Sequence, residues 1–296
     1  MPEPINIVML GTGAAIPSPK RNQAAILLHY GPEYFLFDCG EGTQLQLEKA
    51  GVSPSKISKI FISHWHADHF AGLLPLIETL HIQKRKEPLE IYGPEATRFM
   101  DALIELSYWG IGFRIEAIDC GEEEIETVCK GEEYEILSIK VKHSVPAVGY
   151  CFQEKEHWNI DVGKASKFGL KGKQLKIVKE KGEIKVGNKI VTLSEIATKK
   201  EGRKVIYSGD TEACQTLFEV AKGADLLIHD ATFVEPVGER PHSSVGEIAK
   251  LAKDYNLKKL VLTHFSRRYR NDEILETAKP IFKNVIVAED LMKIKI

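Results

Sequence analysis

The sequence predicts an α/β protein in which short strands alternate with helices. Short apolar runs bounded by Gly, Pro, Asn and Asp recur along the chain and are typical of strands. Segments with an apolar face separate several of these runs and indicate helices. Five of the expected strands are followed closely by a histidine, an aspartate or both. Because strand ends meet at one edge of an α/β sheet, this arrangement predicts a functional site there.

The first half of the chain begins with a strand, a hairpin and a helix. The opening strand runs into Gly11-Thr12-Gly13, and Gly31-Pro32 turns the chain between the next two strands. Gly51 stands where a helix C-terminal glycine is expected. The expected strands in this half cover residues 5–10, 24–29, 34–37, 59–62, 89–92, 113–118 and 135–141, and the expected helices cover 43–50 and 96–106, with a further helix starting within 70–77.

The second half contains a segment of different composition. Residues 155–200 are charged, dotted with glycine and poor in apolar periodicity, which predicts an insertion that projects from the core. Strands at 205–207, 226–228 and 259–262 follow it. We therefore expect a single domain over residues 1–296 that carries an insertion at 155–200.

The composition is that of an ordinary soluble globular protein, with 40 Lys and Arg against 42 Asp and Glu and 43% hydrophobic residues. No apolar run approaches the roughly 18 residues that a membrane span needs. The N-terminal residues lack the basic and apolar regions of a signal peptide. The five scattered cysteines contain no C-x-x-C pair and are most simply reduced structural thiols. These features predict a cytoplasmic protein that does not contact membranes.

The segment 62–72, Ile-Ser-His-Trp-His-Ala-Asp-His-Phe-Ala-Gly, places three imidazoles and a carboxylate between a strand and a helix. Residues two apart on a nearly extended chain project to the same side, so His64 and His66 can bind one metal. Asp68 and His69 follow the turn and can reach a second metal. The alternative is that the two histidines form an exposed strand face without binding metal. A metal site is favoured because imidazole with carboxylate is a ligand set that zinc prefers.

Three later strand ends supply the remaining ligands. A lone aspartate at a strand end is most often a helix cap, but its neighbours favour Asp210 as a bridge between two ions. Paired ions lower the pKa of a hydroxide held between them. Asp68 could orient that hydroxide and accept its proton. The expected ligands are His64, His66 and His143 for one ion, and Asp68, His69 and His264 for the other, with Asp210 shared.

This ordered set resembles the signature of the metallo-β-lactamase superfamily, H-x-H-x-D-H followed by His, Asp and His on separate strand ends. The resemblance spans nearly the whole chain. It implies a four-layer αβ/βα sandwich of two mixed β-sheets flanked by helices, with two Zn²⁺ per subunit between the sheet edges. The superfamily includes lactamases, thioesterases, glyoxalases, sulfatases and nucleases, so the fold does not decide the substrate.

Four further stretches resemble the tRNase Z family of tRNA 3′-processing endoribonucleases. Residues 229–232, His-Asp-Ala-Thr, are similar to its His-Glu-Ala-Thr element, and residues 242–244, His-Ser-Ser, are similar to its His-Ser-Thr element. Residues 262–269 match its third-histidine segment closely. Residues 11–17, followed by Lys20, Arg21 and Asn22, resemble its first loop, although the Pro-x-Lys-x-Arg-Asn pattern appears here as Pro-Ser-Pro-Lys-Arg-Asn.

His242 is the expected proton donor of this site. Residues 244–247, Ser-Val-Gly-Glu, form a capping-box pattern, so His242 should lie just before a helix N-terminus, which favours anions. There it could donate a proton to a departing ribose oxygen, with Asp230 orienting its imidazole. An exposed loop histidine is the commoner alternative. Arg268 and its neighbour Arg267 are expected to face the metals and suit a phosphodiester.

Lysines crowd residues 164–189 against few carboxylates, which favours a polyanion contact about as strongly as a solvated loop. The resemblance implies that the insertion at 155–200 is the family's tRNA-binding arm. Its usual Gly-Pro-rich core is replaced here by residues 168–173, Phe-Gly-Leu-Lys-Gly-Lys. The residues expected to contact tRNA are Lys20, Arg21, Asn22, Lys171, Lys173 and Arg268.

The resemblance implies a zinc-dependent endoribonuclease that removes the 3′ trailer from precursor tRNA. Cleavage would leave a 3′-hydroxyl on the tRNA and a 5′-phosphate on the trailer. It also implies a homodimer, in which one subunit's arm holds tRNA for the other's site. The alternatives are a phosphodiesterase or arylsulfatase of the same fold acting on small esters, and an RNA-binding protein without catalysis. The basic insertion and Arg268 argue against the first, and the intact ligand set argues against the second.

Overall fold

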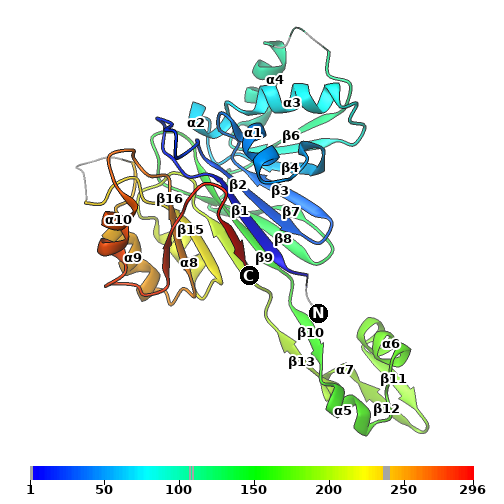
Figure 1. Ribbon diagram of the computed structural model, residues 1–296. Coiled ribbons are helices and arrows are strands. Elements are labelled where there is room, and N and C mark those ends of the chain that lie inside the picture. The colour runs from blue at the N-terminus through cyan, green and yellow to red at the C-terminus, as the bar shows by residue number, and fades with distance from the viewer. Residues whose placement is uncertain (1–2, 107, 109, 236–240) are drawn as a thin grey trace. The chain divides into compact units, whose positions relative to one another are not determined.

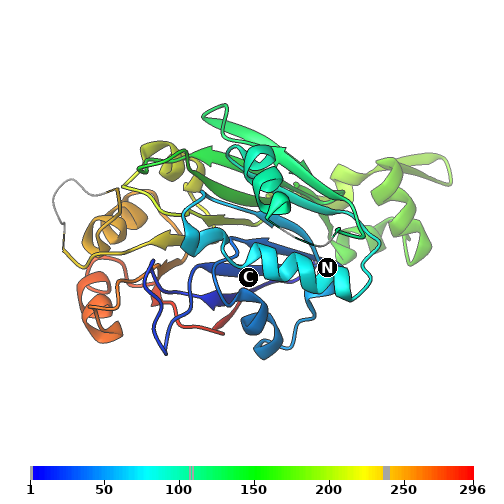
Figure 2. The same cartoon turned by 90° about the horizontal axis from the view of Figure 1, so that it is seen from above.

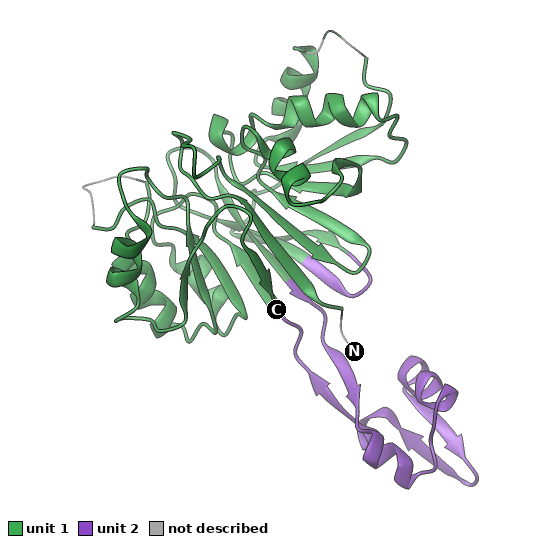
Figure 3. Ribbon diagram, viewed as in Figure 1, with its two compact units in different colours: residues 1–130, 136–152, 204–296 green, residues 131–135, 153–203 purple. Residues whose placement is uncertain are grey.

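The computed structural model describes residues 3–106, 108, 110–235 and 241–296, and the chain forms two compact units (Figure 3). The first unit comprises residues 1–130, 136–152 and 204–296. The second comprises residues 131–135 and 153–203, so it contains the insertion expected at 155–200.

The first unit contains two mixed sheets of seven strands each. In the first sheet the strand order is β18-β1-β2-β3-β4-β5-β6. The pairs from β18 to β3 are antiparallel, and those from β3 to β6 are parallel. Its strands are β1 (Ile5–Gly11), β2 (Ala25–Tyr30), β3 (Glu33–Phe37), β4 (Ile57–Phe61), β5 (Leu89–Gly93), β6 (Ile115–Asp119) and β18 (Lys293–Lys295).

The second sheet has the order β17-β16-β15-β14-β9-β8-β7. The pairs from β14 to β17 are parallel. Its strands are β7 (Ile125–Lys130), β8 (Tyr134–Lys140), β9 (Val148–Glu154), β14 (Lys204–Tyr207), β15 (Leu226–Asp230), β16 (Leu260–Thr263) and β17 (Val285–Val287). The sequence pattern does not predict β7 or β9. Polar residues interrupt the first, and the second continues into the charged segment.

Aromatic side chains join the facing sides of the two sheets. The ring of Phe35 on β3 lies 6.0 Å from that of Phe152 on β9, and Phe61 on β4 lies 5.3 Å from Tyr150 on β9. All four rings are almost completely buried. Burial of such large apolar side chains is a main source of stability, so this layer fixes one sheet against the other.

Helices cover the outer face of each sheet (Figures 1 and 2). Leu76 of α3 packs on the first sheet, and Leu217 of α8 and Ile248 of α9 pack on the second. This is the expected four-layer αβ/βα sandwich. No helix in the described part of the chain is long and apolar enough to cross a bilayer. The helices are α1 (Thr43–Lys49), η1 (Pro54–Lys56), α2 (Ala67–Phe70), α3 (Leu73–Ile82), α4 (Ala96–Glu105), α8 (Gln215–Ala221), α9 (Val245–Asp254) and α10 (Asn271–Ala278).

The second unit has a small core of its own. Leu170, Val178, Val191 and Ile196 are buried against one another. The sequence pattern does not predict its helices, because α6 carries only three apolar residues among lysines, a glutamine and a glutamate. Its elements are β10 (His157–Ile160), α5 (Val162–Lys167), α6 (Lys173–Lys181), β11 (Glu183–Val186), β12 (Lys189–Thr192), α7 (Leu193–Ile196) and β13 (Ala197–Lys200).

The cysteines are expected to resist thiol reagents in the folded protein. All five are buried, and burial raises the pKa of Cys39 and of Cys120 to about 12. Because the thiolate is the reactive form, labelling by iodoacetamide at neutral pH should be slow until the chain unfolds. Mass spectrometry of native and urea-unfolded protein measures this. Rapid labelling of Cys39 in the native protein would contradict the buried placement.

Candidate functional site

Five strand ends of the first unit deliver their side chains to one place, as the sequence predicts. The loop after β4 carries the His-x-His-x-Asp-His segment, and β4 belongs to the first sheet. The other four strand ends, after β8, β14, β15 and β16, belong to the second sheet. Residues contributed by both sheets therefore build the site.

The first cluster consists of His64, His66 and His143. The Nε2 atom of His64 lies 2.9 Å from Nδ1 of His66, and Nε2 of His143 lies 3.1 Å from the same atom. The Nδ1 atom of His143 contacts the carbonyl oxygen of Pro241 at 2.9 Å, so it carries the proton and leaves Nε2 with a lone pair. Burial and the neighbouring His69 hold the pKa of His64 well below its usual range. Neutral imidazoles facing one point are the form that binds a metal.

The second cluster consists of Asp68, His69, Asp210 and His264, and all four residues are buried. Oδ2 of Asp210 lies 3.3 Å from Nε2 of His69 and 3.3 Å from Nε2 of His264. Oδ2 of Asp68 lies 3.4 Å from the same nitrogen of His264. Among the described residues, neither Nε2 of His69 nor Oδ1 of Asp210 has a hydrogen-bond partner. Such orphaned buried atoms fit ligands that face a cation.

Asp210 stands between the two clusters because of its local backbone. Its Oδ2 atom is 3.9 Å from Nε2 of His64, which links the first cluster to the second. The preceding Gly209 has φ of 59°, and a Cβ there would lie 2.6 Å from Cβ of Ser63. Only glycine suits both the conformation and the close approach. The bridging position predicted for Asp210 is therefore consistent with its geometry.

Asp38 supports the second cluster, and the sequence pattern does not single it out. Its Oδ2 atom accepts hydrogen bonds from Nδ1 of His69 at 2.7 Å and from the hydroxyl of Tyr207 at 2.6 Å. Its Oδ1 atom accepts from the backbone N–H of Ser63 at 2.7 Å. These contacts fix the tautomer that directs Nε2 of His69 into the cluster. The only signal in the sequence is an Asp before Cys39-Gly40, which also suits an ordinary turn.

The electrostatics of the second cluster favour a cation. Burial opposes protonation of His264, but the carboxylates of Asp210, Asp230 and Asp68 together outweigh it and raise the pKa of His264 to about 10. Burial likewise opposes ionisation of Asp68, but the imidazoles of His264 and His69 hold the pKa of that carboxyl well below its usual range. The carboxylates thus favour protonation of the neighbouring histidines, which places positive charge in the cluster. A divalent ion would supply the same charge, and the donor set of imidazole and carboxylate suits zinc.

A third group, Asp230 and His242, adjoins the second cluster but is engaged in hydrogen bonds. Nδ1 of His242 donates to Oδ2 of Asp230 at 2.9 Å. Oδ1 of Asp230 accepts from the backbone N–H of Thr232 at 2.8 Å and from its hydroxyl at 2.6 Å. The hydroxyl of Thr232 in turn lies 2.9 Å from Nδ1 of His264. These bonds occupy the carboxylate, so the pair is better suited to proton transfer than to metal binding.

His242 is held where it can exchange protons with a ligand. Its side chain is 20% exposed, and it lines the same cavity as Asp68 and Asp210. Burial lowers the pKa of His242, but the hydrogen bond to Asp230 together with the charges of Asp230 and Asp210 outweighs this and raises the pKa above the usual value. A protonated imidazole beside a phosphodiester can serve as a general acid.

The capping box expected at residues 244–247 does not form. Helix α9 begins at Val245, as predicted, but the side chain of Ser244 makes no cap hydrogen bond, and its Oγ has no partner among the described residues. Ser244 is buried in an isolated β-bridge with Phe233, and the N–H of Val245 donates to the carbonyl of Phe233 at 2.9 Å. This backbone pairing sets the start of the helix in place of the cap.

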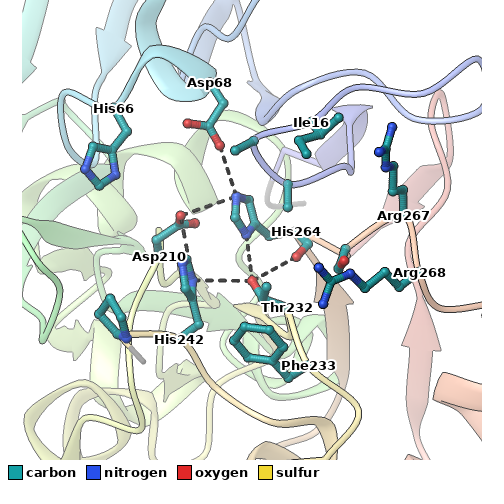
Figure 4. Close-up of a pocket in the computed structure, with 14 residues that line it drawn as sticks. Ile16, His66, Asp68, Asp210, Thr232, Phe233, His242, His264, Arg267 and Arg268 are labelled. Carbon is teal, nitrogen blue, oxygen red and sulfur yellow. Dashed lines mark hydrogen bonds and ion pairs between the residues drawn. The ribbon is translucent and has the colours of Figure 1, made fainter. Parts of the chain in front are cut away.

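A cavity of about 420 Å³ contains His66, Asp68, Asp210, His242 and His264, and its remaining walls come from two loops. Ala14, Ala15 and Ile16 of the first loop form one wall, and the exposed Arg267 and Arg268 form another (Figure 4). The predicted arginine Arg268 therefore lies at the cavity. Ala14, Ala15 and Ile16 belong to the loop motif at residues 11–17, but the residues predicted in that loop to contact substrate are Lys20, Arg21 and Asn22.

The remaining residues predicted to bind substrate lie elsewhere. Lys20 is exposed and lines a neighbouring cavity together with Arg21. The side chains of Arg21 and Asn22 are partly buried and hydrogen-bond within the protein, Arg21 to Asn271 and Asn22 to Asp290. Lys171 and Lys173 are exposed on the second unit. Their contact with RNA stays a prediction.

Comparison with known proteins identifies the family of this chain. Residues 33–265 match the family model described as the beta-lactamase superfamily domain. A ribonuclease Z of Methanosarcina acetivorans is 40% identical, over 99% of this chain and 98% of the relative. A ribonuclease Z of Pyrococcus horikoshii is also 40% identical, over 99% and 96%. The chain belongs to the ribonuclease Z family. Its alignment with these ribonuclease Z proteins, over 99% of the chain, covers both clusters of the site and the second unit.

Solved structures agree with the family. The short form of human tRNase Z has 30% sequence identity and a TM-score of 0.69, and the match covers 98% of each chain. The metallo-beta-lactamase fold protein YhfI of Bacillus subtilis has a TM-score of 0.72 but 19% identity, so it supports the fold alone. This ribonuclease Z family member thus has the metallo-β-lactamase fold that the ligand pattern implies.

Removal of metal is expected to lower the thermal stability of this ribonuclease Z family member. An ion that binds only the native state stabilises it by about 2.7 kcal/mol at a free concentration of 100 times its Kd. Calorimetry before and after chelation, and after return of Zn²⁺, should show the melting temperature fall and recover. His69→Ala, which removes a ligand of the second cluster alone, should show a smaller fall in melting temperature on chelation than the unaltered protein. An unchanged melting temperature of the unaltered protein on chelation and Zn²⁺ return would count against a metal centre.

Proposed function

We propose that this protein is a zinc-dependent endoribonuclease that removes the 3′ trailer from precursor tRNA. Cleavage leaves a 3′-hydroxyl on the tRNA and a 5′-phosphate on the trailer, and the cofactors are two Zn²⁺ per subunit. The observation that carries the proposal is one cavity in which both ligand clusters adjoin the His242–Asp230 pair and Arg268. The similarity to ribonuclease Z proteins over 99% of the chain supports the choice of substrate.

The ligand clusters define what bound metal contributes. His64, His66 and His143 would hold one ion, and Asp68, His69 and His264 would hold the other, with Asp210 shared. Two ions in such a site supply Lewis acidity and a nucleophile from water at neutral pH. The remaining steps belong to side chains of the protein.

Different residues transfer protons on the attacking side and on the leaving side of the phosphorus. Asp68 and His242 lie on opposite sides of His264 (Figure 4), with Asp68 3.4 Å from Nε2 of His264 and the His242 ring stacked at 5.6 Å. In-line displacement at phosphorus needs a proton acceptor on the attacking side and a donor on the leaving side. Asp68 accepts the proton of the attacking water, and His242 donates one to the departing 3′-oxygen of the ribose.

Two further groups set up this transfer. Asp230 holds Nδ1–H of His242, which turns Nε2 of the imidazole towards the cavity. Arg268 can bind a non-bridging phosphate oxygen with its guanidinium, and Arg267 lies beside it. A small neutral ester would leave these cations without a partner. Arginine therefore favours a phosphodiester substrate.

Lys171 and Lys173 are proposed to bind the tRNA away from the cleavage site. The double substitution Lys171→Gln and Lys173→Gln is expected to raise KM for precursor tRNA with little change in kcat. The slope of log affinity against log salt should fall by about one for each phosphate that a lysine no longer neutralises. The matched control is Lys279→Gln with Lys283→Gln, which removes two exposed lysines of the first unit. Equal effects of both pairs would contradict a binding role for the second unit.

We also propose that the protein works in the cytoplasm as a homodimer, in which one subunit's second unit binds tRNA for the other's site. This extends the resemblance to the tRNase Z family. Light scattering measures the mass in solution, and a monomer at the concentrations of the cleavage assay would refute the dimer. Mixing Asp68→Ala chains with chains lacking Lys171 and Lys173 tests the shared site. Recovery of activity in the mixture is expected.

The rival function is hydrolysis of small phosphodiesters or sulfate esters. The test compares kcat/KM for a 3′-extended precursor tRNA with kcat/KM for bis(p-nitrophenyl) phosphate. The proposal expects the RNA to be strongly preferred, and expects the lysine double variant to lower activity on the RNA alone. Efficient turnover of the small ester together with uncleaved precursor would favour the rival.

A further inference from the structure

Asp290 lies outside the catalytic cavity but holds the loop that walls it. It follows β17 and precedes β18. Its Oδ1 atom accepts a hydrogen bond from the hydroxyl of Thr12 at 2.7 Å. Its Oδ2 atom accepts from the backbone N–H of Asn22 at 2.7 Å, from the amide of Asn22 at 3.0 Å and from the amide of Gln46 at 3.2 Å. One carboxylate therefore fastens both ends of the first loop.

Arg21 belongs to the same network. Nη1 of its guanidinium donates to the hydroxyl of Thr12 and, at 2.8 Å, to the carbonyl of Ala288. Nη2 donates to Oδ1 of Asn271 at 2.6 Å, and the guanidinium lies 4.6 Å from the centre of the Phe265 ring. These contacts direct the cation into the protein. Its position indicates a structural link between the first loop and the segment after β16.

The first loop is paired directly with the third-histidine segment. The N–H of Phe265 donates to the carbonyl of Thr12 at 3.1 Å, and the N–H of Ala14 donates to the carbonyl of Phe265 at 3.1 Å. Phe265 follows His264, whose φ of 59° lies in a region that non-glycine residues rarely adopt. Displacement of the loop would therefore move a cavity wall together with the segment after Phe265, which carries Arg267 and Arg268.

We propose that Asp290 is a positioning residue that sets where the phosphodiester lies against the catalytic groups. It acts by fixing the position of residues 12–22 relative to residues 264–268. In this role Arg21 and Asn22 are its hydrogen-bonding partners and not RNA ligands. The inference rests on the proposed function, since the substrate is the precursor tRNA. The wall that it sets consists of Ala14, Ala15 and Ile16, which line the cavity together with Arg268 and His242.

The substitution Asp290→Asn tests this with little change in shape. An amide has one acceptor oxygen where the carboxylate has two, and its NH₂ group would face the donors of Thr12 or of Asn22. Leaving such donors unsatisfied loosens the loop while the side-chain volume is kept. The matched control is Asp272→Asn, which makes the same chemical change at an exposed residue that pairs with Arg270 and lines the neighbouring cavity.

The measurements are kcat and KM for a 3′-extended precursor tRNA, the mapped 3′ ends of the products, and turnover of bis(p-nitrophenyl) phosphate. For Asp290→Asn we expect kcat on the RNA to fall about tenfold or more with KM little changed, since misplacement of about 1 Å can cost 10²-fold. Product ends should spread to neighbouring nucleotides. Metal content and turnover of the small ester, which the loop does not need to align, should match the unaltered protein.

A second pair of variants separates positioning from folding. Thr12→Val removes the hydroxyl that joins Asp290 to Arg21 and should reproduce the altered product ends of Asp290→Asn. Thr12→Ser keeps the hydroxyl and should cleave as accurately as the unaltered protein. Thr12→Val combined with Asp290→Asn should be no worse than the more affected single variant, because both break one network.

Two results would overturn the inference. One is accurate cleavage at the unaltered rate by Asp290→Asn. The other is an equal loss of RNA cleavage, small-ester turnover and bound metal, which would assign Asp290 to general stability. If the unaltered protein fails to cleave precursor tRNA, the proposed function fails first and the positioning role fails with it. The assay of the unaltered protein therefore distinguishes failure of the proposed function from failure of the positioning role alone.

Discussion

Replacing Asp68 by alanine is expected to abolish measurable cleavage of precursor tRNA, with a fall in single-turnover rate of about 10³-fold or more. The residue has two roles in the proposed site. Its carboxylate faces His69 and His264 within the second cluster, and it is also the group that accepts the proton of the attacking water. Loss of either role removes activation of the nucleophile.

The same variant should bind tRNA almost as well as the unaltered protein. Most of the affinity is expected from phosphate contacts made by lysines and arginines outside the second cluster. Asp101→Ala is a suitable control, since it removes an exposed carboxylate of α4. Single-turnover kinetics and filter binding measure the two properties. Retained cleavage by Asp68→Ala would refute its assigned role, and a failure to bind tRNA would show that its effect extends beyond chemistry.

Replacing His242 by alanine is expected to lower the cleavage rate by about 10²- to 10⁴-fold, the range of general acid catalysis. The imidazole lies outside both ligand clusters in this assignment, so bound metal should be retained. Zinc content measured on the purified variant checks that point. Asp230→Asn should cause a smaller loss, because it weakens the hydrogen bond that orients His242 while the imidazole itself remains.

A substrate with a sulfur leaving atom distinguishes acid catalysis from a structural effect. A 3′-phosphorothiolate at the cleavage site departs as a thiolate and has little need of a proton. The ratio of rates for the sulfur and oxygen substrates should therefore be much higher for His242→Ala than for the unaltered protein. Equal losses on both substrates would contradict the role of His242 as proton donor.

The ligand clusters could be predicted because their residue types are informative and each follows a strand. Histidine and aspartate after the strands at 59–62, 135–141, 205–207 and 259–262 meet in the structure because the end of β4 in the first sheet and the ends of β8, β14 and β16 in the second sheet converge. The pairing of His242 with Asp230 could be predicted from the same reasoning and from the family resemblance. In each case the chemistry of the side chain itself supplied the signal.

The supporting residues could not be predicted, because their roles come from contacts between distant segments. Asp38 and Asp290 each look like ordinary turn residues in the sequence. Their hydrogen bonds reach His69 and Thr12, and the second contact spans 278 positions in the chain. Arg21 illustrates the converse case. Its charge and its place in a family motif suggested RNA binding, whereas the structure directs its guanidinium towards Thr12, Ala288 and Asn271.

The helix start at Val245 shows the limit of local patterns. Ser244 and Glu247 have the spacing of a capping box, and the helix does begin there. The pairing of Ser244 with Phe233 is a tertiary contact that buries the serine and replaces the local cap. Likewise, the helices of the second unit depend on a shared core that includes Leu170 and Val178, which no single segment reveals.

The most direct test of the account is cleavage of a 3′-extended precursor tRNA by the full-length protein with Zn²⁺, followed by mapping of both new ends. We predict one cut directly after the discriminator nucleotide, with a 3′-hydroxyl on the tRNA and a 5′-phosphate on the trailer. Chelation should stop the reaction and added Zn²⁺ should restore it. An uncleaved precursor, or products that carry a 3′-phosphate, would contradict in-line attack with a departing ribose 3′-oxygen and with it the central claim.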